Sequence, residues 1–254
     1  MNIMQNRFKQ AILAGKQQIG LWSTLSTAFA AEAVAVAGFD WLLLDTEHSP
    51  GDVLTVLSQL QALSGFPEVS AVVRPATNDA VLIKRFLDIG AQTLLIPYIQ
   101  SAAEARAAVA AVRYPPAGMR GVSALTRATQ FGRIANYPKI AEAEICLLLQ
   151  IETQAGLDAL EDICAVDGVD GVFVGPGDLA ASLGYIGQMG HEVVVAAIED
   201  AIKRIKACGK PAGILTGDVA FAKRGIELGT SFTAVGVDVG LLARAADALA
   251  KQFL

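Results

Sequence analysis

Short apolar runs alternate with stretches of helical spacing along the whole chain. Runs of four to seven residues that carry few polar side chains are typical of strands buried on both faces of a parallel sheet. Eight segments follow this pattern and are predicted to be strands: 19–23, 41–45, 70–74, 93–98, 145–151, 169–174, 212–215 and 232–237.

Each predicted strand is followed by a predicted helix, and Gly38, Gly90, Gly209 and Gly229 stand where helices are expected to end. The main predicted helices are 28–37, 52–63, 80–89, 102–112, 154–165, 192–207, 219–228 and 241–253, with a helix over 4–15 before the first strand and a short helical turn from Leu179. About eight β/α units in 254 residues predict a (β/α)₈ TIM barrel forming a single domain over 1–254. A doubly wound sheet is the alternative.

One long segment rich in Pro, Gly and Arg, from about 115 to 138, interrupts the alternation after the fourth unit. A loop of that length in a compact domain is often functional or in contact with another subunit. The chain also lacks an apolar run near the roughly 18 to 20 residues of a membrane span. Its polar N-terminus lacks the apolar core of a signal peptide, which predicts a cytoplasmic protein.

Charge and cysteine content narrow the choice of partners. The net charge is −5 without a basic cluster, which argues against nucleic acid and acidic membrane surfaces. Cys146, Cys164 and Cys208 are widely spaced, so they indicate neither a metal-binding pair nor a disulfide framework.

The ends of the apolar runs carry the candidate chemistry. FDWLLLDTEH ends with Asp45 and His48, and the next run ends with Arg74. CLLLQIE ends with Gln150 and Glu152, and GVFVGPGD ends with Gly177 and Asp178. Because a TIM barrel builds its active site at the C-terminal ends of its strands, we expect these side chains at one rim. Trp22, near the end of the first run, and Leu215, at the end of the seventh, are expected to contact substrate there.

Two interpretations of each polar group remain open from the residues alone. Glu152 and Asp178 are suitable ligands for a hard cation such as Mg²⁺ or Mn²⁺, or they cap the following helices. Arg74 binds a substrate anion or forms an internal ion pair. His48 is a general base whose tautomer is set by Asp45 or another acid, or it is a structural histidine.

Two other chemistries are disfavoured by position. GPGDLA matches a dinucleotide-binding fingerprint, but it follows the sixth strand and places Asp178 where a pyrophosphate would lie. A Schiff-base aldolase needs a desolvated lysine inside the barrel, and none of the lysines interrupts an apolar strand. His191 begins a predicted helix and is interpreted as structural.

Several ordered motifs together resemble one enzyme family over essentially the full length of the chain. They are GLWSTL, AGFDWLLLDTEH, VVRP, IKRFLDIGAQTLLIPYIQ, RYPPAGMRGVS, LLLQIET, GVDGVFVGPGDLAASLG and AVGVD. The sequence resembles the HpcH/HpaI aldolases, which are metal-dependent (class II) pyruvate aldolases. One departure is Thr46, where many members have glycine.

The resemblance implies roles for residues at matching positions. It implies that His48 is the base, that Arg74 stabilises the pyruvate enolate, and that Glu152 and Asp178 bind the metal. It further implies that Gln150 and the backbone at Gly177 and Asp178 contact substrate. Asp88, which would raise the basicity of the histidine, ends a predicted helix away from the rim. It would therefore have to come from a neighbouring subunit of a trimer or hexamer.

The implied reaction is cleavage of a 4-hydroxy-2-oxo acid with Mg²⁺ or Mn²⁺, or alternatively Co²⁺. We expect 4-hydroxy-2-oxoheptanedioate to give pyruvate and succinic semialdehyde, as in aromatic compound catabolism. The alternative is 2-dehydro-3-deoxyglucarate aldolase, which gives pyruvate and tartronate semialdehyde. More remote alternatives are a citrate-lyase-like thioester lyase and a noncatalytic carboxylate-binding barrel.

Overall fold

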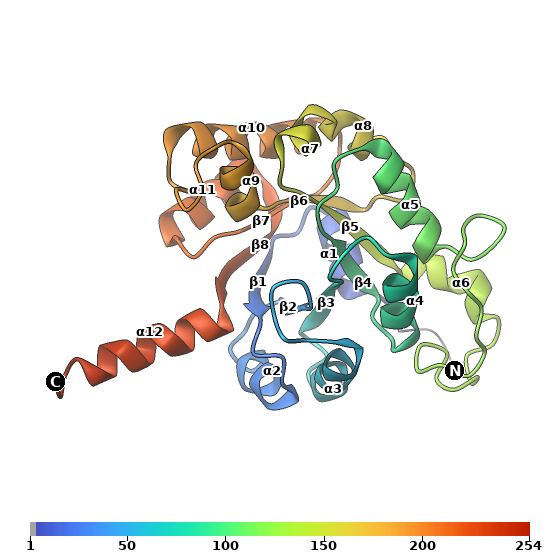
Figure 1. The fold of residues 1–254 in the computed structure, drawn as a ribbon. Coiled ribbons are helices and arrows are strands. Elements are labelled where there is room, and N and C mark those ends of the chain that lie inside the picture. Colours follow the sequence, from blue (N-terminus) through green and yellow to red (C-terminus); the bar gives the residue numbers. More distant parts are fainter. Residues whose placement is uncertain (1–3) are drawn as a thin grey trace.

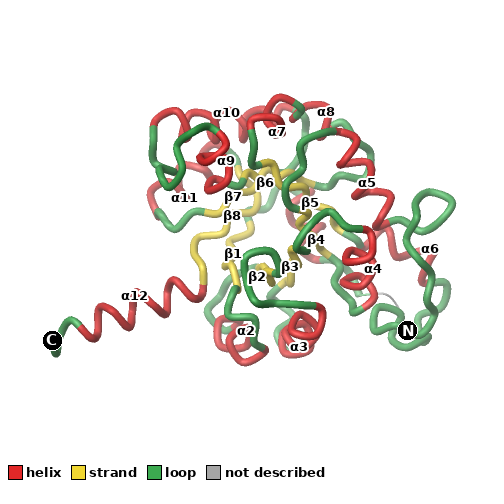
Figure 2. Tube along the Cα trace, viewed as in Figure 1, coloured by secondary structure: helices red, strands yellow, loops and turns green. Residues whose placement is uncertain are grey.

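Eight parallel strands close into a barrel in chain order in a computed structural model that describes residues 4–254 (Figure 1). Figure 2 shows the strands at the centre and most helices around them. The strands are β1 (Gln18–Ser23), β2 (Trp41–Asp45), β3 (Ser70–Arg74), β4 (Thr93–Ile96), β5 (Cys146–Ile151), β6 (Gly171–Val174), β7 (Ala212–Leu215) and β8 (Thr230–Val237). The prediction of a (β/α)₈ barrel is confirmed, and the doubly wound alternative is excluded.

Helices follow the strands as predicted, and the four glycines expected at helix ends all have positive φ, the conformation that lets a glycine end a helix. The helices are α1 (Arg7–Leu13), α2 (Ala28–Ala35), α3 (Val53–Leu63), α4 (Ala80–Asp88), α5 (Ala102–Val112), α6 (Tyr137–Glu144), α7 (Gln154–Asp158), α8 (Leu160–Cys164), α9 (Pro176–Ser182), α10 (Glu192–Ala207), α11 (Val219–Leu228) and α12 (Asp238–Ala250).

Three helix predictions need correction. The predicted helix over 154–165 is broken at Ala159 into α7 and α8. No helix was predicted after the long loop, where the structure has α6, which begins at Tyr137 with proline in its first turn. The helix after β6 begins at Pro176, ahead of Leu179, since proline is favoured at the first helical position.

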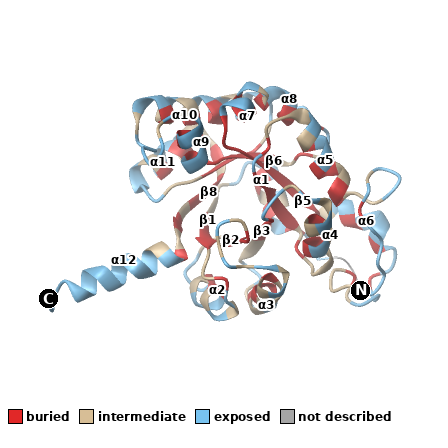
Figure 3. Cartoon of the chain, viewed as in Figure 1, coloured by how far each residue is buried: buried red, intermediate tan, exposed pale blue. Residues whose placement is uncertain are grey.

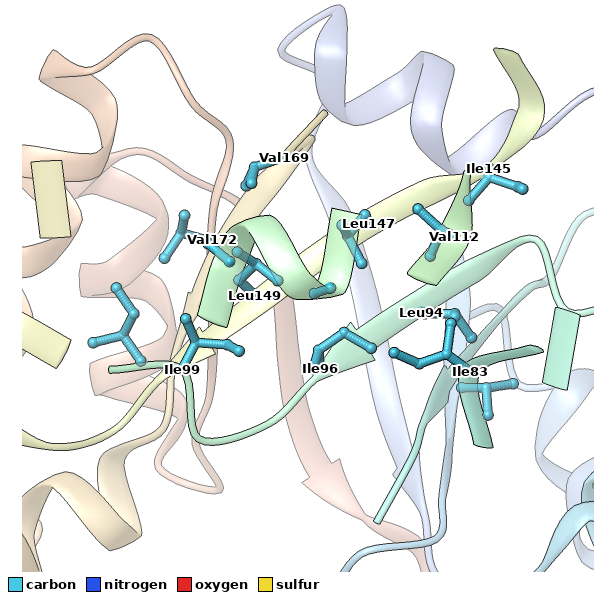
Figure 4. Close-up of a cluster of buried hydrophobic side chains, with 14 of the residues drawn as sticks. Ile83, Leu94, Ile96, Ile99, Val112, Ile145, Leu147, Leu149, Val169 and Val172 are labelled. Carbon is cyan, nitrogen blue, oxygen red and sulfur yellow. The ribbon is translucent and has the colours of Figure 1, made fainter. Parts of the chain in front are cut away.

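Buried side chains form two layers. The outer layer lies between the strands and the surrounding helices and includes Ile83, Leu94, Leu149 and Val172 (Figure 4), and Figure 3 shows the barrel strands as largely buried. The inner layer fills the barrel with aromatic rings, among them Phe8, Trp22, Trp41, Phe173 and Phe232. This inner layer makes the barrel a packed core that supports a site above it.

Glycine provides the room that one of these rings needs. A Cβ atom on Gly213 would lie 2.2 Å from the ring of Phe232. We expect Gly213→Ala to lower the free energy of unfolding by about 1–3 kcal/mol, because overpacking a dense core forces rings off their rotamers. Urea unfolding would measure this change in the free energy of unfolding. Gly190→Ala is the control, since its Cβ would meet no atom within 4 Å. Equal midpoints for the two variants would contradict the packing argument.

The helix α12 leaves the barrel and projects away from it (Figure 1). Figure 3 shows it exposed along nearly its whole length, and Asp238 is its one buried residue. In residues 4–254, no helix is both long and apolar enough to span a membrane.

Candidate active site

A cavity of about 870 Å³ opens at the C-terminal ends of the strands. All the predicted site residues except Asp45 and Asp88 line it: Trp22, His48, Arg74, Gln150, Glu152, Gly177, Asp178 and Leu215. The structure therefore brings together residues from six strand ends, as parallel strands in a closed barrel require.

Arg74 is the buried cation of this cavity. Its Nε and one terminal nitrogen each donate to a carboxylate oxygen of Asp45 at 2.8 Å, across the directly paired ends of β2 and β3. The other terminal nitrogen lies 2.7 Å from Oε2 of Glu47, and the guanidinium lies 5.2 Å from the Trp22 ring centroid. A guanidinium has five N–H donors, so this arrangement leaves N–H groups for a ligand in the cavity.

His48 is more exposed and stands between two carboxylates. Its Nε2 lies 3.9 Å from Glu47 Oε2 and 4.0 Å from Asp178 Oδ2. Both separations exceed a hydrogen bond, so neither carboxylate holds Nε2 directly. Thr46, the departure from the family pattern, turns inward and its hydroxyl donates to the Arg74 carbonyl at 2.7 Å. The branched side chain thus ties the β2 end to the β3 end.

Glu152 is a buried carboxylate with an altered proton affinity. Its Oε1 accepts the Tyr98 amide at 2.9 Å, and its Oε2 accepts Gln150 Nε2 at 2.5 Å. Burial raises the pKa of Glu152 to about 7, with a further contribution from the charges of Glu47 and Asp178 and partial offset by the Gln150 hydrogen bond. Burial likewise raises the pKa of Glu47, although Arg74 opposes the shift.

Gly175 allows this close arrangement at the start of α9. A Cβ atom there would lie 2.5 Å from Glu152 Oε2 and 3.0 Å from Gln150 Nε2. Gly177, two residues later, would place a Cβ in open space. In the GPGDLA segment, the backbone at Gly175 thus passes close to the buried carboxylate of Glu152.

Comparison with known proteins agrees with this geometry. The family described as "HpcH/HpaI aldolase/citrate lyase" matches residues 18–245. A pyruvate aldolase of Rhizobium etli is 68% identical over 100% of this chain and 99% of its own length. A 4-hydroxy-2-oxo-heptane-1,7-dioate aldolase of Salmonella heidelberg is 57% identical, covering 98% and 95% of the two chains.

A crystal structure of an HpcH/HpaI aldolase/citrate lyase family protein from Burkholderia cenocepacia superposes with a TM-score of 0.94 at 39% identity, covering 98% and 99% of the two chains. The chain belongs to the HpcH/HpaI aldolase family. The resemblance inferred from the motifs is confirmed, and the protein is a carbon–carbon lyase of the aldolase type.

Two predicted site residues of this aldolase are not part of the cavity lining. Both oxygens of Asp45 accept hydrogen bonds from Arg74, so Asp45 orients the guanidinium, and its influence on the tautomer of His48 stays a prediction. Asp88 ends α4 outside the cavity and pairs with Arg120 at 3.1 Å. Within one chain Asp88 cannot assist His48, and its role across a subunit boundary stays a prediction.

Three residues that position the aldolase site were not among the sequence candidates. Glu47 pairs with Arg74, Tyr98 donates its amide to Glu152 from a positive-φ backbone, and Gly175 clears space for Glu152. Glu47 was detectable because it lies between two candidates in DTEH. The other two act through backbone geometry, which side-chain chemistry does not indicate. His191 caps α10 and stacks on Tyr185, in keeping with a structural histidine.

Proposed function

We propose that this aldolase cleaves a 4-hydroxy-2-oxo acid, with 4-hydroxy-2-oxoheptanedioate as the preferred substrate, to pyruvate and succinic semialdehyde. The observation that carries the proposal is the convergence of His48, Arg74, Gln150, Glu152 and Asp178 on one cavity. The proposal is further supported by the relatives, one named a pyruvate aldolase and another named for the heptanedioate substrate. We also propose that residues 1–254 form a single domain.

The donor set suits a divalent cation such as Mg²⁺, Mn²⁺ or Co²⁺. Burial raises the pKa values of Glu47 and Glu152, and the negative charge of Asp178 contributes to both shifts. Within 4–254 there is no cluster of three His, Cys, Asp or Glu side chains that could hold a metal alone. A hard cation needs only one or two carboxylates and completes its shell with water and substrate oxygen. Glu152 and Asp178 are the proposed ligands.

The chain's own residues account for the proton and charge movements. When bound, the cation would supply Lewis-acid polarisation of the 2-oxo group. His48 takes the proton of the 4-hydroxyl, and the electrons of the breaking C3–C4 bond move into the pyruvate half. Arg74 donates its remaining N–H groups to the developing enolate oxygen, and Asp45 holds the guanidinium in the direction that this requires. Gln150 and the amides at Gly177 and Asp178 are the proposed contacts of the substrate's pyruvate half.

Pyruvate release tests the function. We expect purified protein with Mg²⁺ or Mn²⁺ to form pyruvate from 4-hydroxy-2-oxoheptanedioate, followed with lactate dehydrogenase, and to lose this activity with a chelator. Oxaloacetate is a second probe, because a site that stabilises an enolate also decarboxylates it. Absence of pyruvate from both compounds, with and without metal, would favour a noncatalytic binding barrel.

The raised pKa of Glu152 predicts a pH dependence of the metal-free protein. A carboxyl whose pKa is about 7 when folded and near 4.5 when unfolded binds more protons in the folded state. Its contribution to stability is therefore complete below about pH 4.5 and is lost as the pH rises through 7. We expect the free energy of unfolding, relative to Glu152→Gln, to fall over this window in urea titrations. A constant difference between the two proteins would contradict the shift.

We further propose that the protein is a homo-oligomer in which α12 packs on a second copy. Apolar side chains recur on one face of this segment at Leu242, Ala246, Leu249 and Phe253, and all four are exposed. A helix without a packing partner gains little stability in water. Phe29 on α2 is also 82% exposed, and self-association would bury both surfaces.

A charge on the apolar face should dissociate the assembly. We expect Leu249→Asp to lower the mass measured by analytical ultracentrifugation at micromolar concentration, because burying an unpaired carboxylate is costly. Gln252→Asp adds the same charge at an exposed polar position and should leave the mass unchanged. A wild-type mass equal to one chain would refute the proposed assembly.

A further inference from the structure

Arg244 is a second cation of the cavity, and it comes from α12. The start of that helix is fixed to the barrel because Asp238 accepts the amides of Thr24 at 2.8 Å and Leu25 at 3.2 Å. Arg244 follows Asp238 by six residues, a rise of about 9 Å along a helix. Its guanidinium folds back over Gly240, where a Cβ would lie 3.1 Å from the nearer terminal nitrogen. The side chain therefore points towards the barrel end that carries the cavity.

The two arginines of the cavity differ in their charge balance. Arg74 is matched by the carboxylates of Asp45 and Glu47. Among the ion pairs within residues 4–254, none includes Arg244, so no carboxylate oxygen of this range lies within 4.0 Å of its guanidinium nitrogens. Asp218, another residue of the cavity wall, caps α11 through the Phe221 amide. Arg244 is thus a cation facing the cavity without a protein counter-ion.

The remaining wall is suited to an aliphatic chain. The cavity is lined by apolar side chains of β7, β8, α10, α11 and the segment before α10: Leu215, Val237, Val195, Phe221 and Met189. Its volume of about 870 Å³ exceeds what the pyruvate half of a substrate fills. The cavity therefore has space for the aldehyde half, with apolar lining and one unpaired guanidinium.

We propose that Arg244 binds a terminal carboxylate on the aldehyde half of the substrate. The enzyme then selects short aldehydes that end in a carboxylate over neutral aldehydes of the same length. This inference rests on the proposed aldolase function and adds a specificity-determining residue to it. A guanidinium suits the task because its planar fork matches a carboxylate with two parallel hydrogen bonds.

Aldol synthesis from pyruvate gives the direct test. The quantity is the ratio of kcat/KM for succinic semialdehyde to kcat/KM for butanal, which has the same chain length without the charge. We expect Arg244→Ala to lower this ratio about 10- to 100-fold, the range for losing a hydrogen-bonded charge pair. Arg244→Lys should recover part of the ratio, and Arg244→Glu should lower it at least as far as alanine.

The control is Lys251→Ala, which removes a cation from the exposed segment just after the same helix, outside the cavity lining. It should leave the ratio at the wild-type value. A ratio within twofold of wild type in Arg244→Ala would overturn the assignment of Arg244, even if both rates fall together. Absence of aldol product from wild type with either aldehyde would instead overturn the proposed function, and the assignment with it.

Discussion

Replacing Arg74 by lysine is expected to lower kcat/KM for aldol cleavage by about 100- to 1,000-fold, the usual effect of losing one donor to a developing oxyanion. Lysine keeps the positive charge, but it lacks the planar arrangement of N–H donors that the guanidinium provides. Asp45 is buried and receives two parallel hydrogen bonds from the guanidinium. A lysine ammonium is a point charge that cannot satisfy both oxygens and also donate to the enolate from a fixed direction.

Steady-state kinetics and thermal unfolding together would test this result. A loss that falls mainly on kcat indicates stabilisation of the transition state, whereas a rise in KM with unchanged kcat indicates ground-state binding. Arg106→Lys is the matched control, because Arg106 is exposed on α5. Full activity of Arg74→Lys would exclude the proposed role, and a collapse of the melting temperature would assign Arg74 to folding.

The barrel was predictable because its signals are local. Strands buried on both faces leave nearly continuous apolar runs, and helix ends require a positive φ that glycine adopts without strain. Trp41–Asp45 and Ser70–Arg74 were predicted to the residue. The break at Ala159 was not, because α7 and α8 both keep helical spacing and the kink lies between them.

The candidate site was predictable as a set of strand ends, but its pairings were not. Asp45 lies three residues before His48 in the sequence, which suggests that the two side chains interact. In the structure, however, the β2–β3 register sets Asp45 directly opposite Arg74. A buried guanidinium attracts the carboxylates that its neighbours supply, and this choice depends on distances in space. The exposure of the apolar face of α12 could not be predicted either. An amphipathic pattern predicts that one face is buried, but it does not specify which chain covers that face.

Gly175→Ala is expected to weaken Mg²⁺ or Mn²⁺ binding about 10- to 100-fold, the range typical of disturbing the groups that orient a metal ligand. The added Cβ would lie 2.5 Å from Glu152 Oε2 and 2.9 Å from its Cβ, so the carboxylate must move away from the position that Gln150 and the Tyr98 amide now fix. Metal titration by calorimetry would measure the loss without relying on turnover.

Gly177→Ala distinguishes the loss of space around Glu152 from the loss of backbone flexibility. It makes the same chemical change two residues away in α9, where the new Cβ would meet no atom within 4 Å. Neither glycine has a positive φ, so alanine is sterically acceptable to the backbone at both positions. We therefore expect Gly177→Ala to retain wild-type metal affinity while Gly175→Ala loses it. If both variants lost affinity equally, loop flexibility would explain the glycines and the close approach to Glu152 would be incidental. If neither did, Glu152 would not hold the metal from the position that the structure gives it.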